Sequence, residues 1–478
     1  MEANNNEAKL QRTLKPVHVW SLALGSIIGW GAFVMPGNTF LPNAGPLGTA
    51  IAMGIAALIM ISIAFNYSYM INRYPVAGGE YIYAKNSFGK TMGFVCAWFL
   101  SLAYLAIVPL NATALALIGR NLFPSVFKWG HLYSVQGYDI YVGEILLAVI
   151  ALVLFAVLCI RGIGVAGKFQ TFLAFALVGS VAILGIVAIF SPAASLENLA
   201  PAFAVDAETG SVNLLGIVAV IAVAPWAFVG FDSIPQASEE FNFSPKKSKI
   251  IMVLSILFGG LLYVVLNTIT ASVVPDGYSN WQEYVGDMGN LDGIQSMPTF
   301  NAAEELLGTP GLIILAIALF CAVLSGIIGF YIATSRLLYS LAQDNVLPAP
   351  FGKLHAKSKT PYVAIIFVLV VSLTAPWFGR EVLGWVVDMS SIGAAVGYAF
   401  TSAATLVTAI KNKDAGIILK INAVLGTILS IGFAFLLLSP KSWGLGGLGT
   451  EARIALLVWC VLGIAFYIYT RMKKKNKA

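Results

Sequence analysis

Charged residues are scarce in this sequence. Asp, Glu, Lys and Arg make up 10% of its 478 residues, whereas soluble domains carry about 25%. This deficit excludes an ordinary soluble domain. Together with a hydrophobic content of 59% and a mean hydropathy of +0.85, it predicts an integral membrane protein. The net charge of +6 lies in short loops and tails, so it gives no indication of nucleic-acid binding.

The side chains that build metal sites and hydrolytic centres are also rare. The three histidines lie far apart near loops, and the four cysteines lie within or beside apolar segments. Their spacing matches neither a zinc motif, a catalytic triad nor a disulfide framework. No G-x-x-x-x-G-K-S/T motif is present, so we expect no ATP drive. We therefore expect no enzyme, no resident metal and no cofactor. The residues are His18, His131, His355, Cys96, Cys159, Cys321 and Cys460.

Long apolar segments are abundant, and they predict an all-α protein with about twelve transmembrane helices. The first begins after a polar tail, 1–16, and the chain ends in a basic tail, 472–478. Between the tails, the predicted spans are 17–37, 46–71, 92–119, 140–160, 166–190, 212–236, 249–273, 310–341, 361–378, 382–409, 418–438 and 452–471.

The distribution of basic residues predicts the orientation. If the N-terminus is cytoplasmic, all but five of the 28 Lys and Arg residues lie on the inside, as the positive-inside rule requires. We therefore expect a multi-pass protein of the cell membrane, plasma or inner, with both termini cytoplasmic. We predict a tight cytoplasmic loop between Arg73 and Tyr83, and a short helix from Asn301 to Leu307 over the outer mouth. The five outer residues are Arg120, Lys128, Arg380, Lys441 and Arg453.

Two of the predicted spans are interrupted at their centres. The first contains Gly25-Ser-Ile-Ile-Gly-Trp-Gly-Ala-Phe33, and the sixth contains Ala224-Pro-Trp-Ala-Phe-Val-Gly-Phe-Asp232. Either stretch alone is more typical of close helix packing, because Gly and Pro are common in membrane helices. Broken helices in corresponding positions of two similar halves instead indicate an inverted-repeat transporter with a site at the bilayer midplane.

Four motifs, in order along the chain, resemble those of the amino acid–polyamine–organocation (APC) transporter superfamily. They are G-S-I-I-G-W-G-A-F in the first span, P-V-A-G-G-E-Y after the second, W-A-F-V-G-F-D in the sixth and S-R-L-L-Y-S-L-A-Q-D-N-V-L-P after the eighth. The resemblance to an amino acid permease implies the LeuT-type fold. Residues 17–190 and 212–409 would form two inverted repeats of five helices, and 418–471 two extra helices.

The resemblance also implies a substrate site built mainly from backbone groups at the two breaks. Amides after the first break would bind the substrate carboxylate, at a helix end that favours anions. Carbonyls at both breaks would accept from the ammonium group, and aromatic side chains would enclose the substrate. The amides are those of Trp30, Gly31 and Ala32; the carbonyls are those of Ile27, Trp226 and Val229; and the aromatic residues are Trp226, Phe228 and Phe330.

A few polar side chains complete the predicted site. Asp232 lies just past the second break, and an acid at membrane depth is a functional hypothesis by default. We expect Asp232 to act in gating or coupling, with capping of exposed N–H groups as the alternative. Glu80 of the loop motif is assigned to the same gating or coupling group. Ser101 and Tyr104 are predicted to face the pocket, and Ser26 and Ser325 are further pocket candidates.

Two residues depart from the family pattern. Trp30 stands where many relatives have Ser or Thr, and Leu177 stands where some have a lysine in a sodium-like site. The pocket, aromatic apart from Asp232, favours a neutral amino acid, moved by symport or exchange. The coupling mode remains open between sodium, protons and pure exchange. The oligomeric state in the lipid bilayer remains open between a monomer and a homodimer. The alternatives are a polyamine or other amine transporter, with Asp232 as counter-charge, and a transporter-like sensor or partner-dependent subunit.

Overall fold

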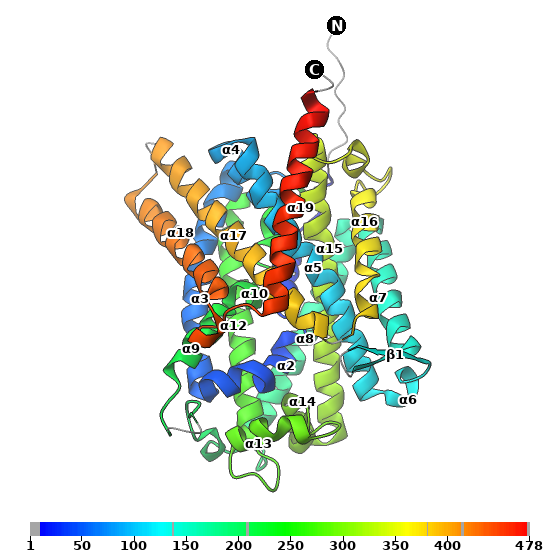
Figure 1. Cartoon of the computed structure of the whole chain (residues 1–478), viewed down its shortest axis with the longest axis vertical. Helices are drawn as coiled ribbons and strands as arrows, with labels where there is room; N and C mark the ends of the chain where they lie inside the picture. The colour runs from blue at the N-terminus through cyan, green and yellow to red at the C-terminus, as the bar shows by residue number, and fades with distance from the viewer. Residues whose placement is uncertain (1–9, 136–137, 207–209, 380, 413–414, 476–478) are drawn as a thin grey trace.

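The computed structural model describes residues 10–135, 138–206, 210–379, 381–412 and 415–475, so the predicted tails 1–16 and 472–478 fall partly outside the described residues. Within these ranges the chain forms a bundle of helices, most of which run roughly along the long axis of the molecule (Figure 1). Nine stretches of the described chain are helical, long and apolar enough to cross a membrane. The structure therefore confirms an all-α integral membrane architecture.

Most long helices coincide with predicted spans. They are α3 (Leu41–Arg73), α5 (Lys90–Leu122), α7 (Val142–Arg161), α8 (Ile163–Phe190), α12 (Ser248–Ser272), α15 (Thr309–Gln343), α17 (Glu381–Lys411), α18 (Ile417–Leu438) and α19 (Thr450–Lys475).

Shorter helices occupy the remaining predicted spans. In the first they are α1 (Pro16–Ile27) and α2 (Gly31–Met35), followed by a π-helical turn, Pro36–Phe40. In the sixth they are α9 (Leu214–Ala222), α10 (Ala224–Ala227) and α11 (Ser233–Gln236), and in the ninth α16 (Tyr362–Ser372).

The connections differ from the sequence predictions in three places. The predicted loop after Arg73 is wrong in part, because Gly79–Phe88 forms a helix, α4, that starts from Gly78 at φ +100°. A small antiparallel hairpin, β1 (His131–Val135) with β2 (Tyr138–Tyr141), follows α6 (Pro124–Phe127) and was not predicted. The short helix predicted at Asn301–Leu307 is confirmed as α14 (Pro298–Leu307), and an unpredicted α13 (Trp281–Asp287) precedes it.

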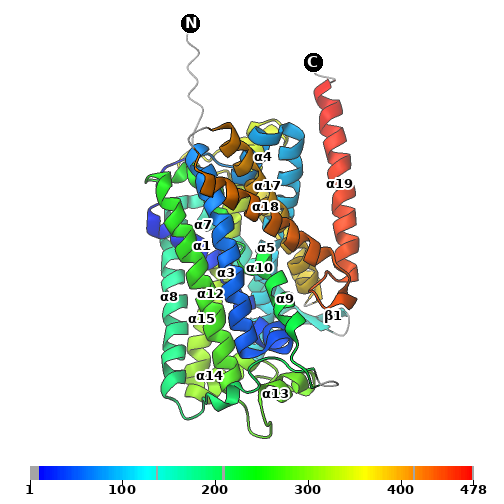
Figure 2. The same cartoon turned by 90° about the vertical axis from the view of Figure 1, so that its left-hand side faces the viewer.

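The connections between the long helices lie at the two ends of the bundle (Figure 1). Helix α4 and the C-terminal end of α19 lie at one end, and the hairpin, α13 and α14 lie towards the other (Figure 1). Figure 2 shows α19 standing apart from the bundle over much of its length. Where α19 meets α5, Trp459 stacks on Trp98 with ring centroids 4.6 Å apart. The interior instead forms around α1, α5, α10, α12 and α15, where the two breaks lie.

Candidate functional site

The first predicted break is present and is local in origin. Helix α1 ends at Ile27, Ile28 adopts an extended conformation (φ −92°, ψ 95°), and helix resumes only at Gly31. Glycine at positions 29 and 31 weakens helix propagation here, because glycine loses more backbone freedom than other residues on folding. The break is fully inside the bundle, since Ile27 and Ile28 are 2% and 0% exposed.

The second predicted break is also present. Helix α10 ends at Ala227, and non-helical turns continue to Asp232 before α11 begins at Ser233. Gly230 has φ +136°, a conformation that L-residues rarely adopt. The carbonyl of Gly230 accepts from the Ser233 N–H at 3.0 Å, which starts the next helical turn.

The two breaks touch each other at Gly230. A Cβ atom placed on this glycine would lie 2.6 Å from the Ile27 nitrogen and 2.7 Å from the Ser26 carbonyl carbon. No side chain fits in this space, so glycine permits the backbone of the sixth segment to lie directly on α1. Segments about 200 residues apart in the chain therefore bring their free backbone groups to one place.

Backbone groups at the breaks are only partly satisfied. In the described residues, the N–H groups of Trp30 and Gly31 have no hydrogen-bond partner, whereas the Ala32 N–H donates to the Gly29 carbonyl at 3.3 Å. The carbonyl of Val229 likewise has no partner among the described residues. The other two predicted acceptors are both occupied. The Ile27 carbonyl accepts from the Tyr263 hydroxyl at 3.2 Å, and the Trp226 carbonyl accepts from the Val229 N–H at 3.2 Å and from the Phe228 N–H.

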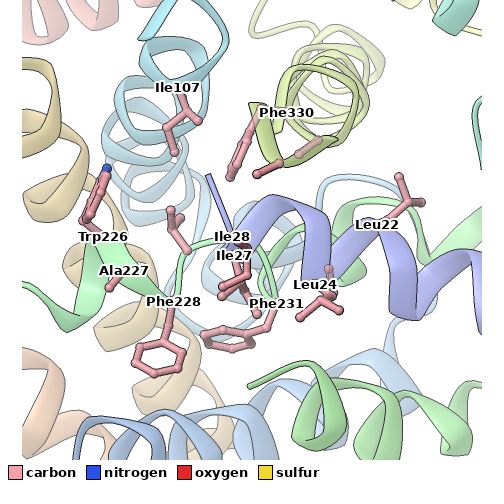
Figure 3. Close-up of a cluster of buried hydrophobic side chains, with 14 of the residues drawn as sticks. Leu22, Leu24, Ile27, Ile28, Ile107, Trp226, Ala227, Phe228, Phe231 and Phe330 are labelled. Atoms are coloured by element: carbon pink, nitrogen blue, oxygen red, sulfur yellow. The ribbon is translucent and has the colours of Figure 1, made fainter. Parts of the chain in front are cut away.

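Aromatic side chains fill the space beside these groups. The Trp226 ring lies directly over Gly31, where any Cβ atom would overlap it, and it makes an edge contact with the Trp30 ring at 6.0 Å. Phe228 and Phe330 are both fully buried, and Phe330 packs on Tyr104 at 5.7 Å. Figure 3 shows Phe330 and Phe228 on different sides of the α1 break. The predicted aromatic residues therefore do lie around the breaks.

The four further pocket candidates differ in position. Tyr104 is buried against Phe330, as described above. Ser26 and Ser325 are buried where α1 meets α15, and both hydroxyls lack a partner in the described part of the chain. Ser101 is only half-buried on α5, and among the described residues its side chain makes no hydrogen bond to either break.

A cluster of two acids and a tyrosine lies beside the second break. The Tyr104 hydroxyl lies 3.1 Å from Glu80 Oε1 and 3.0 Å from Asp232 Oδ2, so it bridges the two carboxyls. Gln236 Nε2 donates to Glu80 Oε2 at 2.6 Å, and the Gly230 N–H donates to Asp232 Oδ1 at 2.6 Å. Glu80 is carried by α4, outside the candidate spans. Burial, with the nearby Asp232 carboxylate, raises the pKa of Glu80.

Contacts that close the α4 end of the molecule were not predicted. Arg336 of α15 donates from Nε and Nη2 to the two Glu240 carboxylate oxygens, both at 3.0 Å, and neither side chain is more than 1% exposed. The Leu14 N–H donates to the Glu240 carbonyl at 3.0 Å, and the Asn242 N–H donates to the Leu14 carbonyl at 2.9 Å. The sequence motif contains Arg336, but its partner lies about 100 residues away, so no local signal identifies the pair.

Comparison with known proteins gives one family and several distant relatives. Residues 14–466 match the family model described as "Amino acid permease". The branched-chain amino acid permease BcaP of Bacillus subtilis (strain 168) is 24% identical, covering 99% of this chain and 96% of the relative. The methylthioribose transporter of the same organism is 22% identical, covering 98% of this chain and 96% of the relative. The low-affinity putrescine importer PlaP of Escherichia coli (strain K12) is 25% identical over 84% and 81%.

Proposed function

Because this chain belongs to the amino acid permease family, we propose that it carries a neutral amino acid across the membrane by alternating access, as a secondary transporter and not as an enzyme. The observation that carries the proposal is the contact between the two breaks at Gly230 and Ile27. Two unpaired N–H groups and one unpaired carbonyl lie at these breaks, among the described residues. These are the groups that a carboxylate and an ammonium group require.

The proposed binding mode assigns each end of the substrate to one set of groups. The N–H groups of Trp30 and Gly31 begin α2 and bind the carboxylate, since a helix start attracts anions. The carbonyl of Val229, with the second lone pair of the Ile27 carbonyl, accepts from the ammonium group, and the Trp226 carbonyl joins them where the Phe228 N–H releases it. Phe228 and Phe330 then enclose the substrate side chain.

A neutral side chain is favoured because the enclosing surface, in the described part of the chain, has no free charge. Trp226, Phe228 and Phe330 supply apolar area. Asp232 is the nearest acid, but both of its carboxylate oxygens already lie within hydrogen-bond distance of Gly230 or Tyr104. The name of the BcaP relative, a branched-chain amino acid permease, supports the same substrate class.

The proposal includes the LeuT-type organisation in twelve spans. Residues 17–190 and 212–409 form the two inverted repeats, 418–471 supplies two further helices, and both termini are cytoplasmic in the cell membrane. The equivalent placement of the breaks at Ile28–Trp30 and Phe228–Asp232 supports the repeat. Helix α4 and the C-terminal end of α19 lie at the same end of the molecule (Figure 1). This supports the proposal that the basic segments beside them lie on the same, cytoplasmic, side of the membrane.

A second candidate substrate is an organic amine. The name of the putrescine importer supports it, and Asp232 would then act as counter-charge. This reading requires the Asp232 carboxylate to leave the Gly230 N–H, which it contacts at 2.6 Å. A sensor or a partner-dependent subunit differs from both candidates in that the purified chain would move no substrate.

The test is counterflow in proteoliposomes. Purified protein is reconstituted with an unlabelled amino acid inside, and entry of the labelled form is measured for neutral and cationic amino acids and for putrescine. We expect exchange of one group of neutral amino acids. Exchange of putrescine alone would overturn the neutral assignment, and exchange of nothing would favour the sensor or partner-dependent subunit.

Gly31→Val tests the backbone site directly. The new side chain would overlap the Trp226 ring and block the approach of a carboxylate to the Gly31 N–H. Loss of a hydrogen bond to a charged group costs about 1.5–3 kcal/mol, so substrate affinity should fall by roughly tenfold to a hundredfold or more. Gly54→Val is the control, because Gly54 is an exposed helical glycine at which a Cβ would meet no atom within 4 Å. Equal affinity in the two variants would contradict the backbone site.

A further inference from the structure

Two adjoining cavities lie where α19 meets α4 and α5, towards the end of the molecule that carries α4. The first, which we call the polar hollow, has a volume of about 350 Å³ and contains charged side chains. The second, which we call the apolar groove, has a volume of about 280 Å³ and an apolar lining. Phe94 of α5 and Tyr467 of α19 line both cavities, so the two form one continuous site.

The polar hollow carries more positive than negative charge. Lys85 and Lys90 line it together with a single acid, Asp344. Lys85 Nζ lies 2.6 Å from Asp344 Oδ2, and the Tyr81 hydroxyl donates to the same oxygen at 2.6 Å, so this acid already has its counter-charge. Lys90 is exposed and makes no ion pair or hydrogen bond within the described residues. Two lysines and one aspartate leave one net positive charge, which suits a single anion.

The apolar groove leads away from this charge between two antiparallel helices. Along α5 it follows one face from Thr91 to Phe99, and along α19 it follows the facing side from Tyr467 back to Cys460. Eight residues of α-helix rise about 12 Å, and one leaflet of a bilayer has a hydrocarbon depth of about 15 Å. Since the apolar part of α5 begins just after Thr91, the groove extends through most of one leaflet.

Hydrogen bonds between α5 and α19 hold the groove open at both ends. The Thr91 and Tyr467 hydroxyls lie 2.7 Å apart at the polar end. At the deep end, Trp98 Nε1 donates to the Trp459 carbonyl at 2.9 Å, and Trp459 Nε1 donates to the Trp98 carbonyl at 3.2 Å. Gly463 leaves room for this pair, because a Cβ atom there would lie 2.5 Å from Trp98 Nε1. The groove is therefore a preformed space between the two helices.

We propose that the polar hollow and the apolar groove bind one anionic glycerophospholipid of the cytoplasmic leaflet. Its phosphate lies in the polar hollow, where Lys90 Nζ donates a charge-assisted hydrogen bond to it. One of its acyl chains lies in the apolar groove. The site goes beyond the proposed transport function and does not depend on the substrate. It uses only the proposed orientation, in which the basic segments face the cytoplasm.

A lipid matches both cavities, whereas a soluble anion matches one. Ile464 lines the groove and is 62% exposed on the surface of α19, so the groove opens to the hydrocarbon of the bilayer. Free phosphate would occupy the polar hollow and gain nothing from the groove. Anionic head groups of the cytoplasmic leaflet lie at the depth of basic residues at helix ends and attract them. A head group with its own ammonium or choline cation would place a further positive charge beside Lys85 and Lys90.

The lipid joins parts of the molecule that otherwise make few contacts. Lys85 belongs to α4, Lys90 and Phe94 to α5, and Tyr467 to α19, so one bound lipid contacts all three helices. Helix α19 stands apart from the bundle over much of its length (Figure 2). Because a ligand stabilises the state that binds it, the lipid should reduce local opening of α19.

The experiment measures lipid binding to the purified full-length protein by native mass spectrometry. The protein in detergent is titrated with dioleoyl phosphatidylglycerol or with dioleoyl phosphatidylethanolamine, which differ in net charge and share their acyl chains. We expect the first phosphatidylglycerol to bind at least fivefold more tightly than the first phosphatidylethanolamine, for one unpaired lysine at the head group. Equal affinities for the two lipids would overturn the proposal.

Variants of Lys90 assign the binding to this site. Lys90→Gln should weaken the first phosphatidylglycerol about fivefold, and Lys90→Glu, which reverses the charge, about twenty-five-fold. Both substitutions are at an exposed position, so we expect both variants to fold. Lys246→Gln is the matched control, because Lys246 is an exposed lysine of another basic segment that does not line either cavity. Equal affinities in the Lys90 and Lys246 variants would refute the assignment.

Amide exchange separates a lipid from a soluble anion. Phosphatidylglycerol should slow exchange in residues 460–467 of α19 in the wild-type protein and much less in Lys90→Glu. Glycerol 3-phosphate, which has the same phosphate and no acyl chains, should leave this exchange unchanged at the same concentration. Equal protection by glycerol 3-phosphate would show an anion site only and overturn the lipid. None of these measurements requires transport, so a protein that shows no counterflow still tests the lipid site.

Discussion

Arg336→Met removes one partner of the buried ion pair near the α4 end of the molecule. Methionine keeps much of the arginine stem but none of its donors. The substitution therefore leaves the Glu240 carboxylate, 1% exposed, without the two 3.0 Å hydrogen bonds from Arg336. Removing one member of a buried ion pair costs about 3–5 kcal/mol.

This cost applies to the closed arrangement described above. If the cytoplasmic side opens during transport, water can reach Glu240 and the penalty there is small. The ratio of closed to open protein should then fall by roughly a hundredfold to a few thousandfold. The partly exposed Lys85–Asp344 pair is the comparison, because such pairs contribute about 0–1 kcal/mol. Asp344→Asn should therefore change little.

Cysteine labelling measures the shift. In a background without the four natural cysteines, Ser21→Cys places a thiol on the buried face of α1, near the α4 end. Maleimide should react with it much faster after Arg336→Met than after Asp344→Asn. Replacing Glu240 by Leu as well should restore slow labelling, because removing both partners of a buried pair is often neutral or stabilising. Equal labelling rates in all these variants would refute a closing role for the pair.

Three smaller predictions concern stability. Gly230→Ala should lower the free energy of unfolding by about 1–3 kcal/mol, seen as a lower melting temperature in detergent, because of the positive φ and the 2.6 Å approach to Ile27. Trp98→Ala removes the stack and the 2.9 Å hydrogen bond to the Trp459 carbonyl, so amide exchange in α19 should rise while exchange in α15 is unchanged. Burial raises the pKa of Glu80, so the folded state binds this proton more tightly than the unfolded chain. Stability should fall as pH rises above the ordinary glutamate pKa of about 4.3, and Glu80→Gln should reduce that slope.

The breaks could be predicted because their causes are local. Gly29 and Gly31 lower helix stability, and Gly230 adopts a positive φ that glycine tolerates. Both properties belong to glycine itself and do not depend on tertiary contacts. The side-chain contacts of the site are harder to predict from the sequence. Nothing near Glu80 in the sequence indicates Gln236 as its partner, and the α4 helix forms where the turn-rich residues 75–79 suggested only a loop. These features depend on segments brought together by the fold.

The position of Trp226 over Gly31 has a consequence for measured affinities. The ring occupies the approach to the amides proposed to bind the substrate, so the described arrangement does not expose them. A substrate can bind only during the fraction of time in which the ring is displaced, and its apparent dissociation constant is the intrinsic constant divided by that fraction. Replacing Trp226 by a smaller residue could therefore tighten binding although it removes contact area. Weak apparent affinity in this protein would then measure the mobility of one indole ring as well as the fit of the substrate.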